Sequence, residues 1–191
     1  VLEPLKIKAL FFVIPYFLTN SYAPEFFLKS LFPNLCNYSG YDIEDFFHLT
    51  RNHINLLYLN GHNIGIHGYK HELSTSLTAT QLDYVITKGK ALLNKLGVST
   101  KHFCYPFGHK ASFSRETNNL LLKHFDFLHI GLRGTNHISN LQRRILYRHP
   151  ISYHGTDLCY KPYSSALATG FAFDPIIRLC SRLRRQPLLP L

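Results

Sequence analysis

Two histidines four positions apart are the first candidates for chemistry in this chain. His67 and His71 form a His-x-x-x-His spacing, which is not rare by chance in a chain with twelve histidines. On a continuous strand the two rings would lie about 13 Å apart, too far to share one ion. A turn, which Gly68 permits, would let both rings reach one metal ion at about 2.1 Å. Two solvated loop histidines are the alternative interpretation.

A second candidate is the segment from Cys104 to Gly108, with the sequence Cys-Tyr-Pro-Phe-Gly. Pro106 fixes its own φ and holds Tyr105 extended, while Gly108 allows a sharp bend. This arrangement would leave the backbone N–H of Phe107 free to point at a ligand, as an oxyanion donor must. An ordinary turn is the alternative interpretation of the same residues.

The elements expected around these segments alternate between strands and helices. The best helix signal covers 79–96, where Thr78 and Gln81 form a capping box and Gly97 is placed to stop the helix. The alternation predicts a parallel α/β layout, open or closed into a barrel, with both candidate segments just after strands, where such folds place their active sites. The other expected helices lie within 53–59 and 114–124, and the expected strands are 7–14 (ended by Pro15), 63–67, 101–105, 127–132 and 145–151.

Composition narrows the class of protein. Apolar residues make up 46% of the chain and charged residues 17%, which supports a sizeable core. The net charge of +10 favours anionic partners such as nucleic acid, phospholipid or acidic glycan, and an ordinary basic surface is an equal alternative. No apolar stretch approaches the length of a membrane helix, and the four cysteines form no Cys-x-x-Cys pair.

The two ends of the chain carry further expectations. Residues 161–191 are expected to form a basic tail, and the first segment loosely imitates a secretory signal, although a buried strand is preferred because Glu3 and Pro15 fit a signal poorly. The sequence contains no methionine, even at position 1, so we expect a processed product or part of a longer chain.

Three segments in order, Ile7–Val13, Gly61–His71 and Tyr105–Gly108, resemble the polysaccharide deacetylase family, also called the NodB-homology domain. The resemblance covers roughly residues 1–150. It implies a deformed, incomplete (β/α) barrel over 1–160, a divalent metal, usually zinc, and hydrolysis of N-acetyl or similar acyl groups from a polysaccharide or amino-sugar oligomer. By position, His67 and His71 match the metal-binding histidines, and Phe107 matches the backbone oxyanion donor. Tyr105, Pro106 and Gly108 are then expected to bind substrate, and His154, or else His149, is the nearest match to the late catalytic histidine.

The chain departs from the family pattern at several positions. The paired aspartates that serve as general base and third metal ligand precede the family's equivalent of the first strand, and no adjacent aspartates occur here. Gly68 replaces the usual Ser or Thr, Cys104 replaces a frequent Arg, and the absence of tryptophan removes the later Asp-Trp motif. The aspartates lie upstream or are lost. The chain alone is therefore predicted to be inactive or nearly so, whereas a longer parent that supplies the aspartates could be active.

Two other functions compete with the hydrolase. A non-catalytic relative that binds a glycan or a protein partner would keep the barrel without the aspartates. A nucleic-acid-binding protein is disfavoured, because the arginines cluster in the tail and no stacking platform is present. The sequence does not specify the glycan, the compartment or the oligomeric state.

Overall fold

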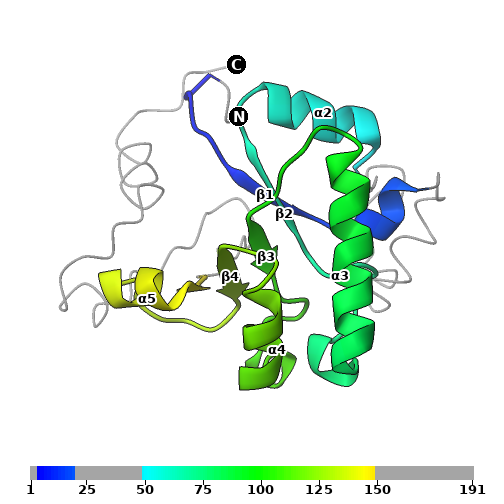
Figure 1. The fold of residues 1–191 in the computed structure, drawn as a ribbon. Coiled ribbons are helices and arrows are strands. Elements are labelled where there is room, and N and C mark those ends of the chain that lie inside the picture. Colours follow the sequence, from blue (N-terminus) through cyan, green and yellow to red (C-terminus); the bar gives the residue numbers. More distant parts are fainter. Residues whose placement is uncertain (1–3, 20–48, 149–191) are drawn as a thin grey trace, which may run out of the picture.

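The computed structural model describes residues 4–19 and 49–148 (Figure 1). Within these ranges five short strands form one parallel sheet, and the strands lie side by side in the order in which they occur in the sequence. Helices connect successive strands, as the alternation predicted. The strands are β1 (Leu10–Val13), β2 (Asn63–Ile66), β3 (His102–Cys104), β4 (Phe127–Ile130) and β5 (Ile145–Tyr147).

The helices differ from their predicted spans mainly at the ends. The α-helices are α2 (Arg51–Leu59), α3 (Ala79–Asn94), α4 (Arg115–Leu121) and α5 (Ile138–Arg143), and three single-turn 3₁₀ segments are η1 (Pro15–Leu18), η4 (Ser74–Ser76) and η5 (Lys110–Ser112). The α5 helix was not predicted, since its six residues carry too little periodic signal. Strands β1 to β4 are shorter than their predicted spans, and the end of the predicted strand 145–151 lies outside the described residues.

Local signals fix the ends of the longest helix. The Thr78 hydroxyl accepts a hydrogen bond from the Gln81 backbone N–H, and the Gln81 side chain accepts one from the Thr78 N–H, so the predicted capping box is confirmed. Gly97 follows the helix with φ of 73°, the left-handed conformation expected for a stop. The buried residues of α3, which include Leu82, Ile86 and Leu93, face the sheet.

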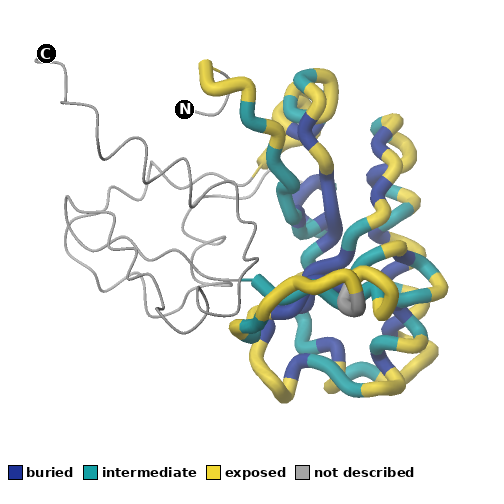
Figure 2. Tube along the Cα trace, turned by 90° about the vertical axis from the view of Figure 1, so that its left-hand side faces the viewer, coloured by how far each residue is buried: buried dark blue, intermediate teal, exposed yellow. Residues whose placement is uncertain are grey.

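The two faces of the sheet differ in chemistry. One face packs against the helices through a continuous apolar core that includes Ile66, Phe103 and Leu128. Figure 2 shows that buried stretches alternate with exposed ones along the described chain. Because side chains alternate along a strand, Phe12, His102, Cys104 and His129 point to the opposite face. That face is therefore the polar one.

Contacts across the polar face show that the sheet is strongly curved. The ring of Phe12 on β1 lies 4.9 Å from that of His129 on β4, and 5.6 Å from the guanidinium carbon of Arg148, just after β5. In a flat sheet the backbone of β1 would lie about 14 Å from that of β4 and about 19 Å from that of β5. The side chains could not make these contacts across such distances. The polar face is thus concave.

Candidate active site

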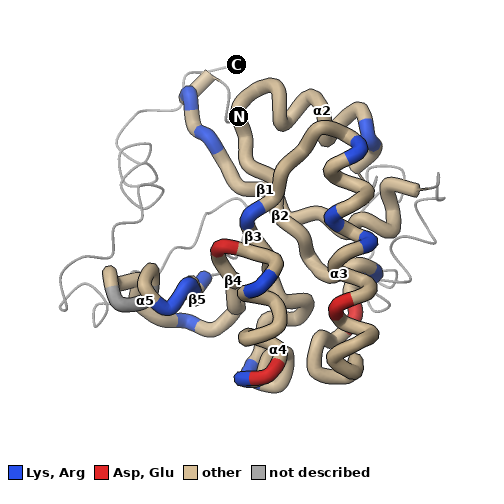
Figure 3. The backbone as a smooth tube through the Cα atoms, in the orientation of Figure 1, with Lys and Arg blue, Asp and Glu red and all other residues tan. Residues whose placement is uncertain are grey.

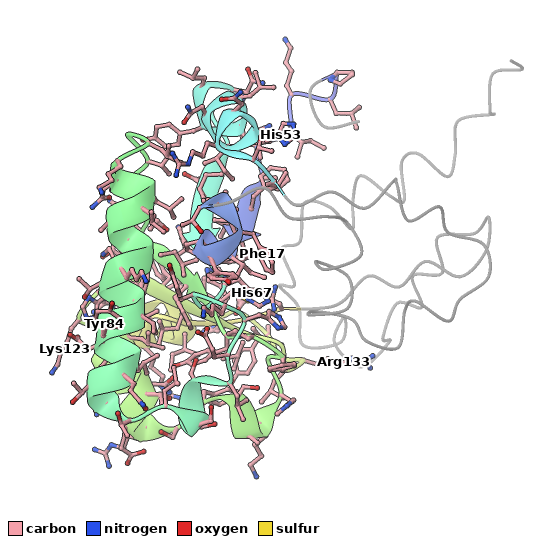
Figure 4. The ribbon with its side chains drawn as sticks, turned by 90° about the vertical axis from the view of Figure 1, so that its right-hand side faces the viewer. Phe17, His53, His67, Tyr84, Lys123 and Arg133 are labelled. Atoms are coloured by element: carbon pink, nitrogen blue, oxygen red, sulfur yellow. The ribbon has the colours of Figure 1, made fainter. Side chains whose placement is uncertain are left out.

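His67 is held at the carboxyl end of β2 by two hydrogen bonds. Its backbone N–H donates to the carbonyl oxygen of Val13 at 2.8 Å, which extends the β1–β2 pairing by one residue. Its imidazole Nδ1 lies 2.9 Å from the carbonyl oxygen of Cys104. A carbonyl can only accept, so Nδ1 carries the proton and the lone pair is on Nε2. Figure 4 shows His67 on the side of the molecule away from the outer surface of α3, where Tyr84 lies.

A tight turn brings His71 back to His67. Gly68 and His71 adopt left-handed conformations with φ of 66° and 67°. Such a conformation is uncommon for residues other than glycine, and residues held in it cluster at functional sites. The turn places the two ring centres 4.8 Å apart, with the ring planes inclined by 68°. The predicted turn is therefore confirmed, and the two histidines are neighbours.

The spacing and protonation of the two rings fit a shared metal ion. A metal about 2.1 Å from a ring nitrogen lies about 3.2 Å from the ring centre, so two imidazoles on one tetrahedral ion have centres about 5 Å apart. Burial lowers the pKa of His67 to about 4, and burial also lowers the pKa of His71 against a smaller opposing effect of Glu72. Both rings are then neutral at pH 7, the form that binds metals. Donation from Nδ1 to a carbonyl is the usual way in which proteins orient a metal-binding histidine.

The described residues do not complete a metal site. Within 4–19 and 49–148 no three His, Cys, Asp or Glu side chains lie close enough together to hold an ion. Glu72 follows His71 directly, but one of its carboxylate oxygens accepts a hydrogen bond from the Lys70 N–H at 2.6 Å. Figure 3 shows how few acidic residues this part of the chain contains: Glu72, Asp83, Glu116 and Asp126.

The turn after β3, which carries the Phe107 amide, lies next to His71. The Gly108 N–H donates to the Pro106 carbonyl at 2.7 Å, and Phe107 between them has φ of 63°, so the three residues form a γ-turn of the strained kind. The Phe107 N–H has no hydrogen-bond partner within the described residues. The exposed Phe107 ring lies 4.8 Å from the His71 ring, so the turn that carries this amide lies next to His71.

Neighbouring residues in this turn have structural roles. The Tyr105 side chain is fully buried, and its hydroxyl donates to Asn118 Oδ1 at 2.6 Å, so the structure places this side chain in the core. Substrate binding at Tyr105 stays a prediction. Pro106 is also buried, and a Cβ on Gly68 would lie 2.9 Å from its ring. This contact explains why a glycine occupies position 68.

Gly108 connects the turn to the next strand. Its carbonyl accepts a hydrogen bond from the Gly131 N–H at 2.9 Å, and a Cβ at Gly108 would lie 2.7 Å from that nitrogen. Gly108 therefore shapes the turn, and its contact with substrate stays a prediction, as does that of Pro106. His149 and His154 lie outside the described residues.

Sequence analysis overlooked Arg148, which the structure places beside the site. Its charge contributes to lowering the pKa values of His67 and His129. Arg148 follows β5 two positions after Leu146, so strand alternation alone would have placed it on the concave face.

Comparison with known proteins identifies the family. The model of the polysaccharide deacetylase family matches residues 1–124. The chain belongs to the polysaccharide deacetylase family. It is 40% identical over 65 residues to a peptidoglycan deacetylase of Helicobacter pylori, an overlap of 34% of this chain and 21% of that protein. A solved structure from Mycobacterium smegmatis, described as a polysaccharide deacetylase, matches with 18% identity and a TM-score of 0.48, over 69% of this chain and 35% of the other.

The chain corresponds to only part of the proteins that it matches. The chain spans about a fifth of the length of the curated deacetylase and about a third of the solved one. None of the helices within residues 4–19 and 49–148 has the length and apolar character needed to cross a bilayer. The family match includes both segments of the candidate site, His67–His71 and Tyr105–Gly108.

Proposed function

We propose that this chain carries part of the active site of a metal-dependent hydrolase that removes N-acetyl or similar acyl groups from a polysaccharide or amino-sugar oligomer. The observation that carries the proposal is the pair His67 and His71, with neutral rings 4.8 Å apart and His67 oriented through Nδ1. Membership of the polysaccharide deacetylase family supports the reaction class.

In this proposal the two histidines would hold a divalent ion, and we propose zinc because imidazole and carboxylate ligands suit it. When bound, zinc polarises the acyl carbonyl and acidifies a water molecule. The Phe107 N–H would donate to the oxyanion that develops on the acyl oxygen. A carboxylate base and an acid for the departing amine are required besides, and His154 remains our candidate for the acid.

The expected architecture is the incomplete (β/α) barrel, with residues 1–160 as its unit and 161–191 as a basic tail. The curvature of the sheet is in keeping with such a barrel, since the concave face carries the side chains that a barrel would enclose. The exposed ring of Phe107 beside the histidines would offer an apolar surface to a sugar ring.

A non-catalytic glycan-binding relative is the second candidate. The observation that favours it is the lack of a third metal ligand within the described residues. Such a protein would keep the concave face and the exposed Phe107, but two imidazoles alone would bind a metal weakly.

The test compares zinc content and acetate release in the full-length protein. Zinc is measured by mass spectrometry, and acetate release is measured with oligomers of N-acetylglucosamine. The His67→Ala, His71→Ala variant should lose both, while the control His53→Gln should keep both, because His53 is exposed on α2 and glutamine can retain its capping contact. Zinc content unchanged in the double variant would reject the metal site. Glycan binding without acetate release would favour the second candidate.

A further inference from the structure

Two arginines flank β5, and their surroundings differ sharply. Arg144, before the strand, directs its guanidinium at three backbone carbonyls: Nε donates to Asp126 at 2.7 Å, and Nη2 donates to Leu122 at 3.2 Å and to Phe125. Its role is structural, because it closes the loop between α4 and β4.

For Arg148, after the strand, the described residues provide no such set of side-chain acceptors. Its backbone N–H donates to the Ile130 carbonyl at 3.0 Å, so the residue continues the β4–β5 pairing. Its side-chain Nε is shielded from solvent and has no hydrogen-bond partner in the part of the chain that the structure describes. A shielded donor of this kind is costly unless a ligand or another group accepts from it.

The guanidinium is held over the concave face. Its carbon lies 5.6 Å from the centre of the Phe12 ring, a cation–π contact that spans from β5 to β1. One terminal nitrogen lies 3.8 Å from the position that a Cβ of Gly108 would take. The cation therefore lies beside the turn that carries the Phe107 amide.

The electrostatic effects of Arg148 agree with this position. Burial is the main cause of the lowered pKa values of His67 and His129, and the positive charge of Arg148 adds to it. Burial raises the pKa of Cys104, and Arg148 opposes part of that rise. None of the acidic residues in 4–19 and 49–148 forms an ion pair with it; the ion pairs there join Asp126 to Lys101 and Arg144, and Asp83 to His124. The site thus contains a cation without a matching anion among the described residues.

We propose that Arg148 is the carboxylate-binding residue of this site. A guanidinium offers a planar fork of donors that matches the two oxygens of a carboxylate, and Nε is one of the donors in that fork. Two sources of a carboxylate are consistent with a deacetylase: the acetate that the reaction releases, and a carboxylate side chain of the protein itself. Acetate as the ligand rests on the proposed function, because only a deacetylase would release it. The binding of a carboxylate by Arg148 does not rest on that function.

The experiment observes the guanidinium directly. In full-length protein treated with a chelator, the ¹⁵N resonance of Arg148 Nε is assigned by its absence from an Arg148→Lys variant. Sodium acetate is then titrated at constant ionic strength, with acetamide as the neutral probe of the same shape. We expect acetate, and not acetamide, to shift the Arg148 Nε resonance. Arg148→Gln should weaken acetate binding at least about tenfold, the loss expected when a charge-assisted bond is removed.

Matched variants show which carboxylate Arg148 binds, and they distinguish a failure of this proposal from a failure of the proposed function. Arg143→Gln removes an exposed arginine at the end of α5 and should leave acetate binding unchanged. If acetate has no effect, but Arg148→Gln lowers kcat at unchanged zinc content and Arg148→Lys restores only part of it, the carboxylate belongs to the protein. If neither acetate binding nor turnover depends on Arg148, the proposal is wrong. A full-length protein that binds acetate through Arg148 without releasing acetate from any N-acetylated oligomer would instead contradict the proposed function alone.

Discussion

His67 Nδ1 donates a hydrogen bond to the main-chain oxygen of Cys104, 2.9 Å away, and so connects the carboxyl ends of β2 and β3. This bond sets which nitrogen of His67 faces the candidate metal position. Because the acceptor is a backbone carbonyl, the orientation of His67 depends on the backbone path of β3. The side chain at position 104 takes no part in this hydrogen bond. The replacement of the family's frequent arginine by Cys104 is therefore compatible with an intact histidine pair.

Gly68→Ala should damage both the fold and the histidine pair. An alanine there would adopt φ near 66°, and its Cβ would lie 2.9 Å from the buried Pro106 ring. We expect a loss of about 2–3 kcal/mol in the free energy of unfolding, combining the cost of a left-handed residue with that of overpacking. Urea denaturation measures the loss, and zinc content should fall with it.

Gly97→Ala is the matched control for this substitution. Gly97 has a similar φ of 73°, but a Cβ there would meet nothing within 4 Å. Only the conformational cost of about 1 kcal/mol is then expected, with unchanged zinc content. Equal losses for the two variants would show that the contact between Gly68 and Pro106 contributes nothing.

Gly108→Ala should displace the Phe107 amide. Its Cβ would lie 2.7 Å from the backbone nitrogen of Gly131, and neither backbone can yield without moving the γ-turn. If the Phe107 N–H stabilises the oxyanion, kcat should fall by about 10²-fold or more with little change in zinc content. Acetate release at saturating substrate measures this effect.

Gly61→Ala serves as the control for the turn. Gly61 has φ of 78°, but a Cβ there would approach only the flexible end of Lys8, at 3.4 Å. This variant should lose some stability and retain kcat. A Gly108→Ala protein with normal kcat would remove Phe107 from the proposed mechanism.

Sequence reasoning succeeded where a signal was local. The capping box at Thr78 and Gln81 and the stop at Gly97 depend on residues a few positions apart, and both were confirmed. Reasoning failed where the direction of a side chain depended on the sheet. Tyr105 lies in the predicted active-site segment, but strand alternation turns its ring into the core.

The same limit explains why Arg148 was overlooked. The contact between Arg148 and Phe12 joins residues on opposite edges of the described sheet, and only the curvature of that sheet brings them together. The His67–His71 pair was predicted more successfully, because the turn that joins the two residues lies within five positions of the chain.

Arg144→Gln tests whether the arginine before β5 is structural. The substitution removes a charged donor from the carbonyls of Leu122, Phe125 and Asp126. We expect a loss of about 2 kcal/mol in the free energy of unfolding, since hydrogen bonds from charged groups contribute more than neutral ones. Arg143→Gln, at an exposed neighbouring position, should change stability by less than about 0.5 kcal/mol. Similar losses in the two variants would contradict the structural role.

The buried His129, which contacts the half-buried His102, makes stability depend on pH. His102 Nδ1 lies 3.1 Å from His129 Nε2, and burial, with smaller effects of His102 and Arg148, lowers the pKa of His129 from 6.5 to about 4. Between pH 6.5 and about pH 4 this histidine is protonated in the unfolded chain but neutral in the folded chain. The free energy of unfolding therefore decreases as the pH is lowered through this range. From the difference in pKa, His129 alone should cost the folded state about 2 kcal/mol at pH 5 and up to about 3 kcal/mol below pH 4. Urea denaturation of chelator-treated protein at pH 7 and pH 5 measures this loss.

The His129→Gln variant should reduce this pH-dependent loss by about 2 kcal/mol, whereas His53→Gln, at an exposed position, should leave it unchanged. Equal pH dependence in both variants would exclude His129 as its source.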